Sequence, residues 1–179
     1  MVLPKKSSDL VDLILDQWSR EAPDLDAKSV AVLGRLHRCD VRYQGLVTQG
    51  LEPYGLSPAS FDVLTSLRRS GPDYQRTAGE LAEIGLITTG GLTQRINRLE
   101  ADGLVERIRD DADRRLVYIK LTEQGLALID QIIRTHFAWQ DSMLGGLTKA
   151  EIAQLATLLS RLEVSLEVAE RLHEDRSAS

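Results

Sequence analysis

The spacing of apolar residues along the chain predicts a mainly helical protein. Apolar side chains recur every three or four residues over 11–18, 32–47 and 152–166, which is the spacing of one buried face of a helix. A further long helix is expected over 123–143. We expect the helices to begin at residues whose side chains can accept a backbone N–H hydrogen bond: Ser7 or Ser8, Asp26, Ser57, Thr77, Thr122 and Thr148.

The pattern changes toward a period of two late in the chain. Residues 105–109 and 116–121 are interpreted as two strands, and the polar segment 110–114 joins them, so they are expected to form a β-hairpin. Two short helices, over 77–84 and 88–102, precede it. Two helices joined by a tight turn and followed by a hairpin form a winged helix-turn-helix, which makes the predicted fold class mainly α with a small β-hairpin.

The same pattern predicts three regions. The terminal helices carry continuous apolar stripes that one small lobe cannot cover, so we expect a second subunit to cover them. The tail after His173 is expected to fray. The predicted regions are N-terminal helices for dimerisation over 1–56, a winged helix-turn-helix lobe for DNA binding over 57–122 and C-terminal helices for dimerisation over 123–179.

Charge and composition restrict the setting. The formal net charge is -5, which disfavours unspecific coating of nucleic acid. Residues 88–120 nevertheless hold seven basic against six acidic side chains, +1 against -6 for the rest. The single cysteine, Cys39, excludes an internal disulfide, no apolar run reaches the roughly 20 residues that span a bilayer, and the N-terminus does not resemble a signal peptide. A cytoplasmic protein without a membrane partner is expected.

The helix over 88–102 has the two faces that a DNA-reading helix needs. Leu92, Ile96 and Leu99 share one side and are expected in the core. The other side is small, polar and basic, and can present donors to base edges in a major groove. Paired glycines would cost a helix about 1 kcal/mol each, unless they lie in the turn before a later helix start. The expected DNA-binding residues here are Thr88, Thr89, Gly90, Gly91, Thr93, Gln94, Asn97 and Arg98.

The hairpin tip adds two further candidates for DNA binding. Arg114 and Arg115 could reach a minor groove, where the potential is most negative. Asp113 could orient Arg115 by a charge-assisted hydrogen bond. A solvated, charged turn is the alternative interpretation.

A resemblance to a known family covers most of the chain. The segment LTQRINRLEADGLVERIRDDADRRLVYIKLTEQG strongly resembles the recognition helix and wing of the MarR family, the multiple antibiotic resistance regulators. The matched features are RLEADGLV, the pattern Asp113-x-Arg115, and Leu121-Thr122 with Gly125. The resemblance extends over about 26–166. It implies a homodimer with interlocked terminal helices that binds a palindromic operator in double-stranded DNA through two recognition helices.

A finer resemblance concerns the ligand. Trp18 followed by Glu21-x-Pro23-Asp24-Leu25-Asp26, and the segment that begins at Thr89 with TGGLT, resemble the urate-responsive branch of that family. This implies a small anionic, purine-like ligand, with urate and xanthine as candidates. The ligand-binding residues that the resemblance implies are Trp18, Asp62, Arg95 and Arg107.

The positions of these residues around their helices support part of this site and leave alternatives open. Arg95 falls on the side of the helix that faces the protein, where its charge needs a carboxylate or an anionic guest. Each of the four residues also has a structural explanation. Trp18 could be core, Asp62 could favour a helix N-terminus, Arg95 could contact a phosphate, and Arg107 could be an exposed strand residue.

The remaining reactive residues form no recognisable site. Cys39 lies in the apolar stripe of the second helix, where cysteine acts as a small hydrophobe, and a redox role for it stays open. His37, His136 and His173 lack metal-ligand spacing. No triad pattern suggests catalysis. We therefore expect no enzyme, no catalytic residue, no metal and no cofactor.

The sequence thus predicts a ligand-responsive transcriptional repressor, released from a palindromic operator by a small anionic, purine-like ligand. Three alternatives remain. The protein could respond to another aromatic or carboxylic acid, it could bind DNA constitutively, or it could be a winged-helix protein-interaction module. The operator and the regulated gene are not encoded in this pattern.

Overall fold

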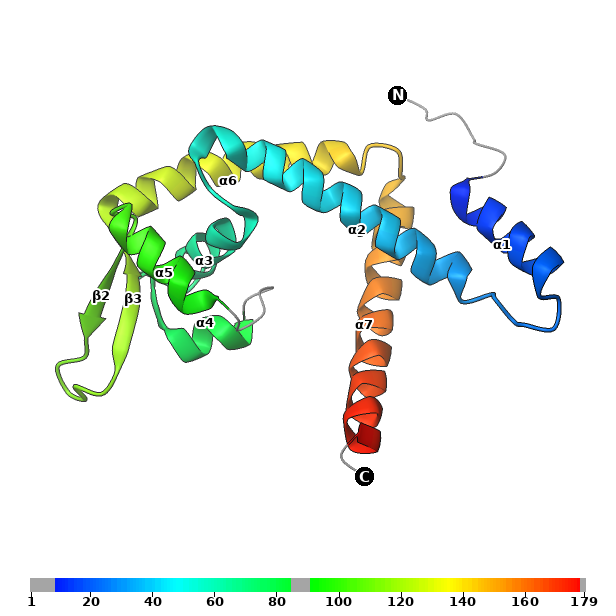
Figure 1. The fold of residues 1–179 in the computed structure, drawn as a ribbon. Coiled ribbons are helices and arrows are strands. Elements are labelled where there is room, and N and C mark those ends of the chain that lie inside the picture. Colours follow the sequence, from blue (N-terminus) through cyan, green and yellow to red (C-terminus); the bar gives the residue numbers. More distant parts are fainter. Residues whose placement is uncertain (1–8, 85–90, 178–179) are drawn as a thin grey trace. The chain divides into compact units, whose positions relative to one another are not determined.

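A computed structural model describes residues 9–84 and 91–177, and the chain divides into two compact units, within 6–136 and within 137–179. Figure 1 shows the elements, and their order confirms the predicted fold class. They are α1 (Leu10–Glu21), α2 (Val30–Leu51), the 3-10 helix η1 (Glu52–Tyr54), α3 (Pro58–Arg68), β1 (Gln75–Thr77), α4 (Ala78–Ile84), α5 (Leu92–Ala101), β2 (Val105–Arg109), β3 (Val117–Leu121), α6 (Glu123–Met143) and α7 (Lys149–Ser177). No helix of the described residues combines the length and the apolar character needed to cross a membrane.

The sheet has three antiparallel strands in the order β1-β3-β2. The wing hairpin pairs Val105 with Leu121 and Arg109 with Val117, so the two predicted strands are confirmed to within a residue. β1 was not predicted, because a strand of three residues is too short to show alternation. It pairs with β3 from Gln75 opposite Lys120 to Thr77 opposite Tyr118, and so fixes the wing to the start of α4.

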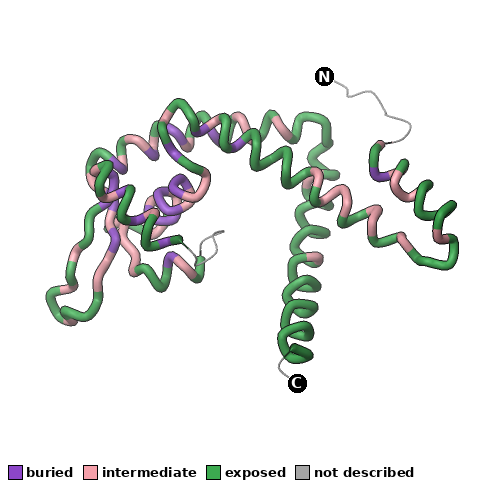
Figure 2. Tube along the Cα trace, viewed as in Figure 1, coloured by how far each residue is buried: buried purple, intermediate pink, exposed green. Residues whose placement is uncertain are grey.

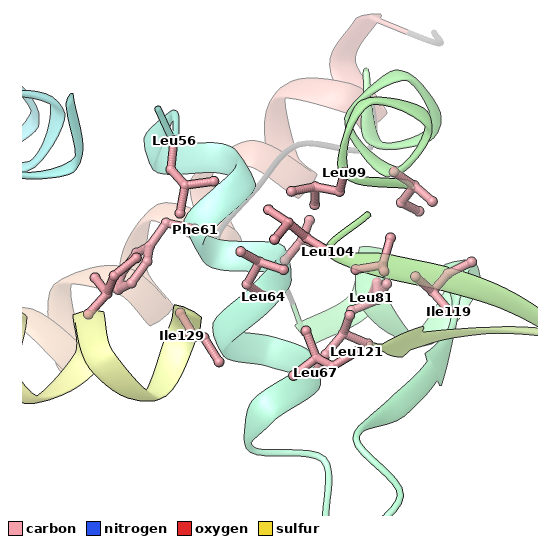
Figure 3. Packing of buried hydrophobic residues seen from close by; sticks show 14 of the residues in the cluster. Leu56, Phe61, Leu64, Leu67, Leu81, Leu99, Leu104, Ile119, Leu121 and Ile129 are labelled. Carbon is pink, nitrogen blue, oxygen red and sulfur yellow. The ribbon is translucent and has the colours of Figure 1, made fainter. Parts of the chain in front are cut away.

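The main hydrophobic core lies within the winged lobe (Figure 3). Side chains of the end of α2, α3, α4, α5, the wing strands and α6 meet in it, and each fully buried leucine or isoleucine contributes about 1.5–3 kcal/mol. Figure 2 shows that burial is concentrated there. Its most deeply buried members are Leu51, Val63, Leu64, Leu67, Ile96, Leu99, Val105, Ile119, Ile129 and Ile132.

Side-chain caps set most helix starts. Ser57 accepts the N–H of Ser60 at 3.1 Å, and Thr122 accepts that of Gly125 at 3.0 Å. Thr77 and Thr148 form the predicted capping boxes with the glutamates three residues on. These four caps are confirmed.

Two predicted caps are wrong. Asp9, not a serine, caps α1 and accepts the N–H groups of Val11 (2.8 Å) and Asp12 (3.1 Å). Asp26 lies in the preceding turn, where it accepts the N–H of Lys28, and α2 begins at Val30 without a side-chain cap. A carboxylate can cap the turn before a helix as readily as the helix itself, which is why the sequence misplaced this start.

The apolar stripes of the long helices are mostly exposed in the single chain. In α2 the predicted stripe over 32–47 buries only Val47, and Cys39, which lies within that stripe, is exposed. The residues described in α7 include none that is buried. This helix continues to Ser177, which corrects the predicted fraying after His173.

The start of α6 lies against the turn before β2. Thr122 Oγ1 donates to the carbonyl of Gly103 at 2.7 Å, and the Thr122 N–H donates to that of Leu104 at 3.2 Å. A Cβ atom added to Gly125 would lie 1.9 Å from the Leu104 carbonyl oxygen. Only glycine permits this approach of α6 to the lobe.

Gly125→Ala should therefore destabilise the protein by about 3 kcal/mol, because a backbone oxygen cannot move aside as a flexible side chain can. Gly45→Ala is the matched control. It lies inside α2 with no atom within 4 Å of the added Cβ, and should stabilise by up to about 1 kcal/mol. Urea unfolding followed by circular dichroism gives both values, and equal midpoints for the two variants would contradict this packing.

Candidate nucleic-acid interface and ligand site

The helix predicted to read DNA begins later than its sequence suggested. α5 starts at Leu92, and Gly91 precedes it with a φ of 90°, a left-handed conformation that favours glycine. Gly91 therefore lies in the turn before the helix, which was the alternative interpretation of this glycine. The predicted DNA-binding residues Thr88, Thr89 and Gly90 lie outside the described residues.

The two faces of α5 are as predicted. Leu92, Ile96 and Leu99 are buried in the lobe. Four polar side chains of the other face are exposed: Thr93, Gln94, Asn97 and Arg98. The Arg98 side chain is 75% exposed and lies 3.9 Å from the Asp102 carboxylate, a separation at which a surface pair adds little stability. Arg98 is thus free to exchange this contact for another anion.

The wing tip orients one of its two arginines. Asp110 Oδ1 accepts the N–H groups of Ala112 and Asp113, which closes the turn. Arg115 then donates from Nε to Asp113 Oδ1 at 3.1 Å, as predicted, and its side-chain and backbone donors lower the pKa of Asp113. The Arg115 side chain remains 92% exposed, while Arg114 is exposed beside it. The wing therefore presents an oriented guanidinium to solvent.

Two of the four predicted ligand residues lie in one electrostatic neighbourhood. Asp62 in α3 is partly buried, and this burial raises its pKa even though the charges of Arg69 and Arg95 act in the opposite direction. Arg95 Nη1 is buried and has no hydrogen-bond partner within the part of the chain that the structure describes. An unsatisfied buried donor is costly, so this nitrogen is suited to receive an acceptor from an anionic ligand.

Two neighbours of Asp62 were not predicted. His136 in α6 is buried and packs against Phe61 in a tilted arrangement, with ring centroids 4.6 Å apart. Burial lowers the pKa of His136, and the charge of Asp62 partly opposes this. Arg69 also acts on Asp62. His136 is 74 positions from Asp62 in the sequence, so only the packing of α6 on α3 could show that the two are neighbours.

The other two predicted ligand residues lie elsewhere. Arg107 in β2 donates from Nη2 to Asn97 Oδ1 at 2.6 Å and from Nη1 to the Glu100 carboxylate, so it contacts α5 on its exposed, polar side. Trp18 in α1 is 46% exposed, so it is not part of the core of the single chain. It borders a surface depression with Gln17 and Glu21. The structure therefore brings Asp62 and Arg95 together and places Arg107 beside the predicted DNA-reading residues.

The described residues contain no group of three or more His, Cys, Asp or Glu side chains placed to hold a metal ion. What the lobe does offer is an exposed polar helix face, an oriented basic wing and a buried guanidinium nitrogen. The polar helix face and the basic wing are features typical of a DNA-binding protein.

Comparison with known proteins finds relatives in the MarR family. The model of the MarR family matches residues 54–116. The transcriptional regulator PecS of Dickeya dadantii is 34% identical over 153 residues, which cover 86% of this chain and 92% of PecS. The multiple antibiotic resistance protein MarR of Escherichia coli is 33% identical over 134 residues, 73% of this chain and 90% of MarR.

Solved structures of similar proteins also come from MarR-family regulators. Bordetella bronchiseptica BpsR, whose DNA binding is regulated by 6-hydroxynicotinic acid, superimposes with a TM-score of 0.66 at 29% identity and covers 74% of this chain and 92% of BpsR. A mutant of E. coli MarR in complex with operator DNA gives 0.65 at 29% identity, over 87% of this chain and 99% of that one. The named relatives are transcriptional regulators and not enzymes. With the winged helix-turn-helix observed here, these matches show that the chain belongs to the MarR family of DNA-binding transcriptional regulators.

Proposed function

We propose that this regulator is a homodimeric repressor, released from a palindromic operator by a small anionic aromatic ligand. The observation that carries the DNA-binding part is the two-sided character of α5. Its apolar side is buried in the lobe, so its exposed polar side is presented in a fixed orientation. The E. coli relative has been solved in complex with operator DNA, which supports duplex DNA as the partner.

In this docking the helix and the wing have separate tasks. Gln94, Asn97 and Arg98 lie against base edges in the major groove, where amide and guanidinium groups discriminate between bases. Arg114 and Arg115 reach the adjacent backbone or minor groove. Thr93 and Gly91, with the predicted residues Thr88, Thr89 and Gly90, approach the phosphates near the helix start.

Arg98→Ala should weaken specific binding about tenfold through loss of base contacts. Arg115→Ala should weaken binding to any duplex and reduce the log–log salt slope by about one, the value of one phosphate contact. Arg20→Ala, an exposed arginine of α1, is the control and should leave both quantities unchanged. Fluorescence anisotropy on the upstream region of the protein's own gene, at several salt concentrations, gives these values. Wild-type binding by both lobe variants would exclude the proposed docking face.

The exposed apolar faces support a dimer. Leu155, Leu159 and Leu166 are each more than two-fifths exposed on α7. Contiguous exposed leucines on a helix that buries none of its described residues indicate a partner surface. We propose that a second copy of the chain covers them, together with the exposed apolar side chains of α1 and α2.

Size-exclusion chromatography with light scattering should show a dimer for the full chain. Removing residues 148–179, or replacing Leu155 and Leu159 by Asp, should give aggregated or unfolded chain instead of a stable monomer, because folding and association are coupled. Glu163→Gln and Glu167→Gln on the same helix are the controls. A soluble, cooperatively folded monomer from the truncated chain would contradict the interlocked dimer.

The ligand site is proposed around Arg95 and Asp62. The buried Nη1 of Arg95 lacks a partner within the described residues, and an anion would supply one. Trp18 and Arg107 are added from the resemblance to the urate-responsive branch, which makes urate and xanthine the first ligands to test. A second candidate is an aromatic carboxylic acid, because the DNA binding of the relative BpsR is regulated by 6-hydroxynicotinic acid.

The contacts of α5 suggest how such a ligand could act. Arg95 lies within the recognition helix, and Arg107 holds Asn97 and Glu100 of the same helix. An anion that attracts either guanidinium therefore acts directly on the element that reads DNA. Release also requires that the ligand bind the DNA-free form more tightly, since equal affinity for both forms shifts no population.

Arg95→Met should lower the affinity for urate or 6-hydroxynicotinate at least about tenfold, since a charge-assisted hydrogen bond contributes about 1.5–3 kcal/mol. Arg69→Met is the matched control. It removes a second cation near Asp62, but one that is exposed and hydrogen-bonded to Ser66 at 2.8 Å. Isothermal titration of wild type and both variants measures the ligand affinity of each protein. No heat with any of these anions, or equal losses in both variants, would show that no site lies at Arg95.

A further inference from the structure

We propose that Arg107 is a positioning residue for DNA recognition, which turns the Asn97 amide so that it offers hydrogen-bond donors to the base edges. The inference rests on the proposed docking of α5 in the major groove. Arg107 belongs to β2 and Asn97 to α5. Their contact therefore connects the first wing strand to the exposed face of the recognition helix.

The guanidinium is fixed at two points. Its Nη2 donates to Asn97 Oδ1 at 2.6 Å, and its Nη1 donates to the Glu100 carboxylate. Asn97 and Glu100 are three positions apart on a helix and are therefore neighbours on its surface. A planar guanidinium held through two nitrogens cannot rotate about either contact alone. The fork thus defines both the position and the plane of the group that faces Asn97.

This geometry determines which end of the amide faces outward. An arginine side chain has donors and no acceptor, so the oxygen of the Asn97 amide must face Arg107 and its nitrogen must point away. The choice between the two amide orientations follows here from chemistry. Asn97 is exposed, so the NH2 group is the part of this side chain available to DNA.

The orientation has a consequence for base preference. An unrestrained asparagine reads adenine with both ends of its amide, accepting from N6 and donating to N7. Arg107 occupies one of the two lone pairs of Oδ1 and restricts the amide plane, which weakens the accepting half of that pairing unless adenine N6 lies in the same plane. The NH2 donors, which Arg107 leaves unoccupied, match O6 and N7 of guanine or O4 of thymine. Arg107 should therefore disfavour adenine at the base pair that Asn97 reads.

The charge of the cluster separates this role from simple phosphate binding. The Glu100 carboxylate neutralises Arg107, and the two side chains are only about one-third exposed, at 38% and 32%. A paired, half-buried guanidinium is a poor phosphate contact. Its removal also leaves the carboxylate unpaired, so total affinity is expected to fall whatever the role of Arg107. The informative readout is therefore the preferred base and not the affinity.

The test is selection of binding sequences from a library of randomised duplex DNA by the full-length protein. Wild type is compared with Arg107→Met, Asn97→Ala and the double variant. Arg109→Met is the matched control, because Arg109 lies two positions on along β2, on the same side of the strand. Arg107→Lys keeps a cationic donor on the strand. It provides a second comparison if Arg107→Met fails to fold.

Asn97→Ala should flatten the preference at one base pair of each half-site, which identifies the position. There, Arg107→Met should shift the preference toward adenine by about tenfold, while the double variant should match Asn97→Ala. Arg109→Met and Arg107→Lys should retain the wild-type base. The proposal is overturned if wild type already selects adenine there, if Arg107→Met keeps the wild-type base, or if Asn97→Ala changes no position. Enrichment of no sequence by wild type would overturn the proposed function, and this inference with it.

Discussion

Burial of one side of α5 is the constraint on which the rest of the lobe depends. Leu92, Ile96 and Leu99 insert between α3 and the wing strands, and this packing fixes the rotation of the helix about its axis. A helix whose rotation is fixed has a defined outer face. The same three side chains that stabilise the lobe therefore also decide which polar residues meet DNA.

Charged side chains around α5 then divide into paired and unpaired groups. Arg107 is held by Asn97 and Glu100, whereas the buried Nη1 of Arg95 has no partner in the described part of the chain. Paired groups impose geometry, and unpaired buried groups carry a cost that a ligand can remove. Both arginines contact or belong to the recognition helix. Ligand binding at Arg95 and DNA recognition by Asn97 can therefore be coupled through this one helix, without a chain of intervening residues.

Unlike α5, the long helices α2 and α7 leave most of their apolar faces uncovered in the single chain. α2 and α7 each expose apolar side chains along most of their length; only Val47 and Leu51, at the end of α2, belong to the lobe core. The hydrophobic effect therefore favours a partner for these faces. α1 is tied to α2 by Arg35, which donates to the carboxylates of Asp9 and Asp12 at 3.0 and 2.5 Å. Val11 packs beside Gly34 under this pair.

The sequence by itself determined the order of elements and the inner face of α5. Helical periodicity predicted Leu92, Ile96 and Leu99 as buried, and alternation predicted the hairpin, because both signals repeat over enough residues to be read locally. The capping boxes at Thr77 and Thr148 were also predicted correctly from the sequence. Such features depend on neighbours a few positions away.

Only the tertiary structure decided contacts between distant segments. It showed that Asp62 lies near His136, that the exposed Arg107 contacts Asn97, and that a three-residue β1 completes the sheet. Periodicity marked the apolar side of α2 but could not show what covers it. Partners of that kind are set by how the elements pack, and no local pattern in the chain encodes them.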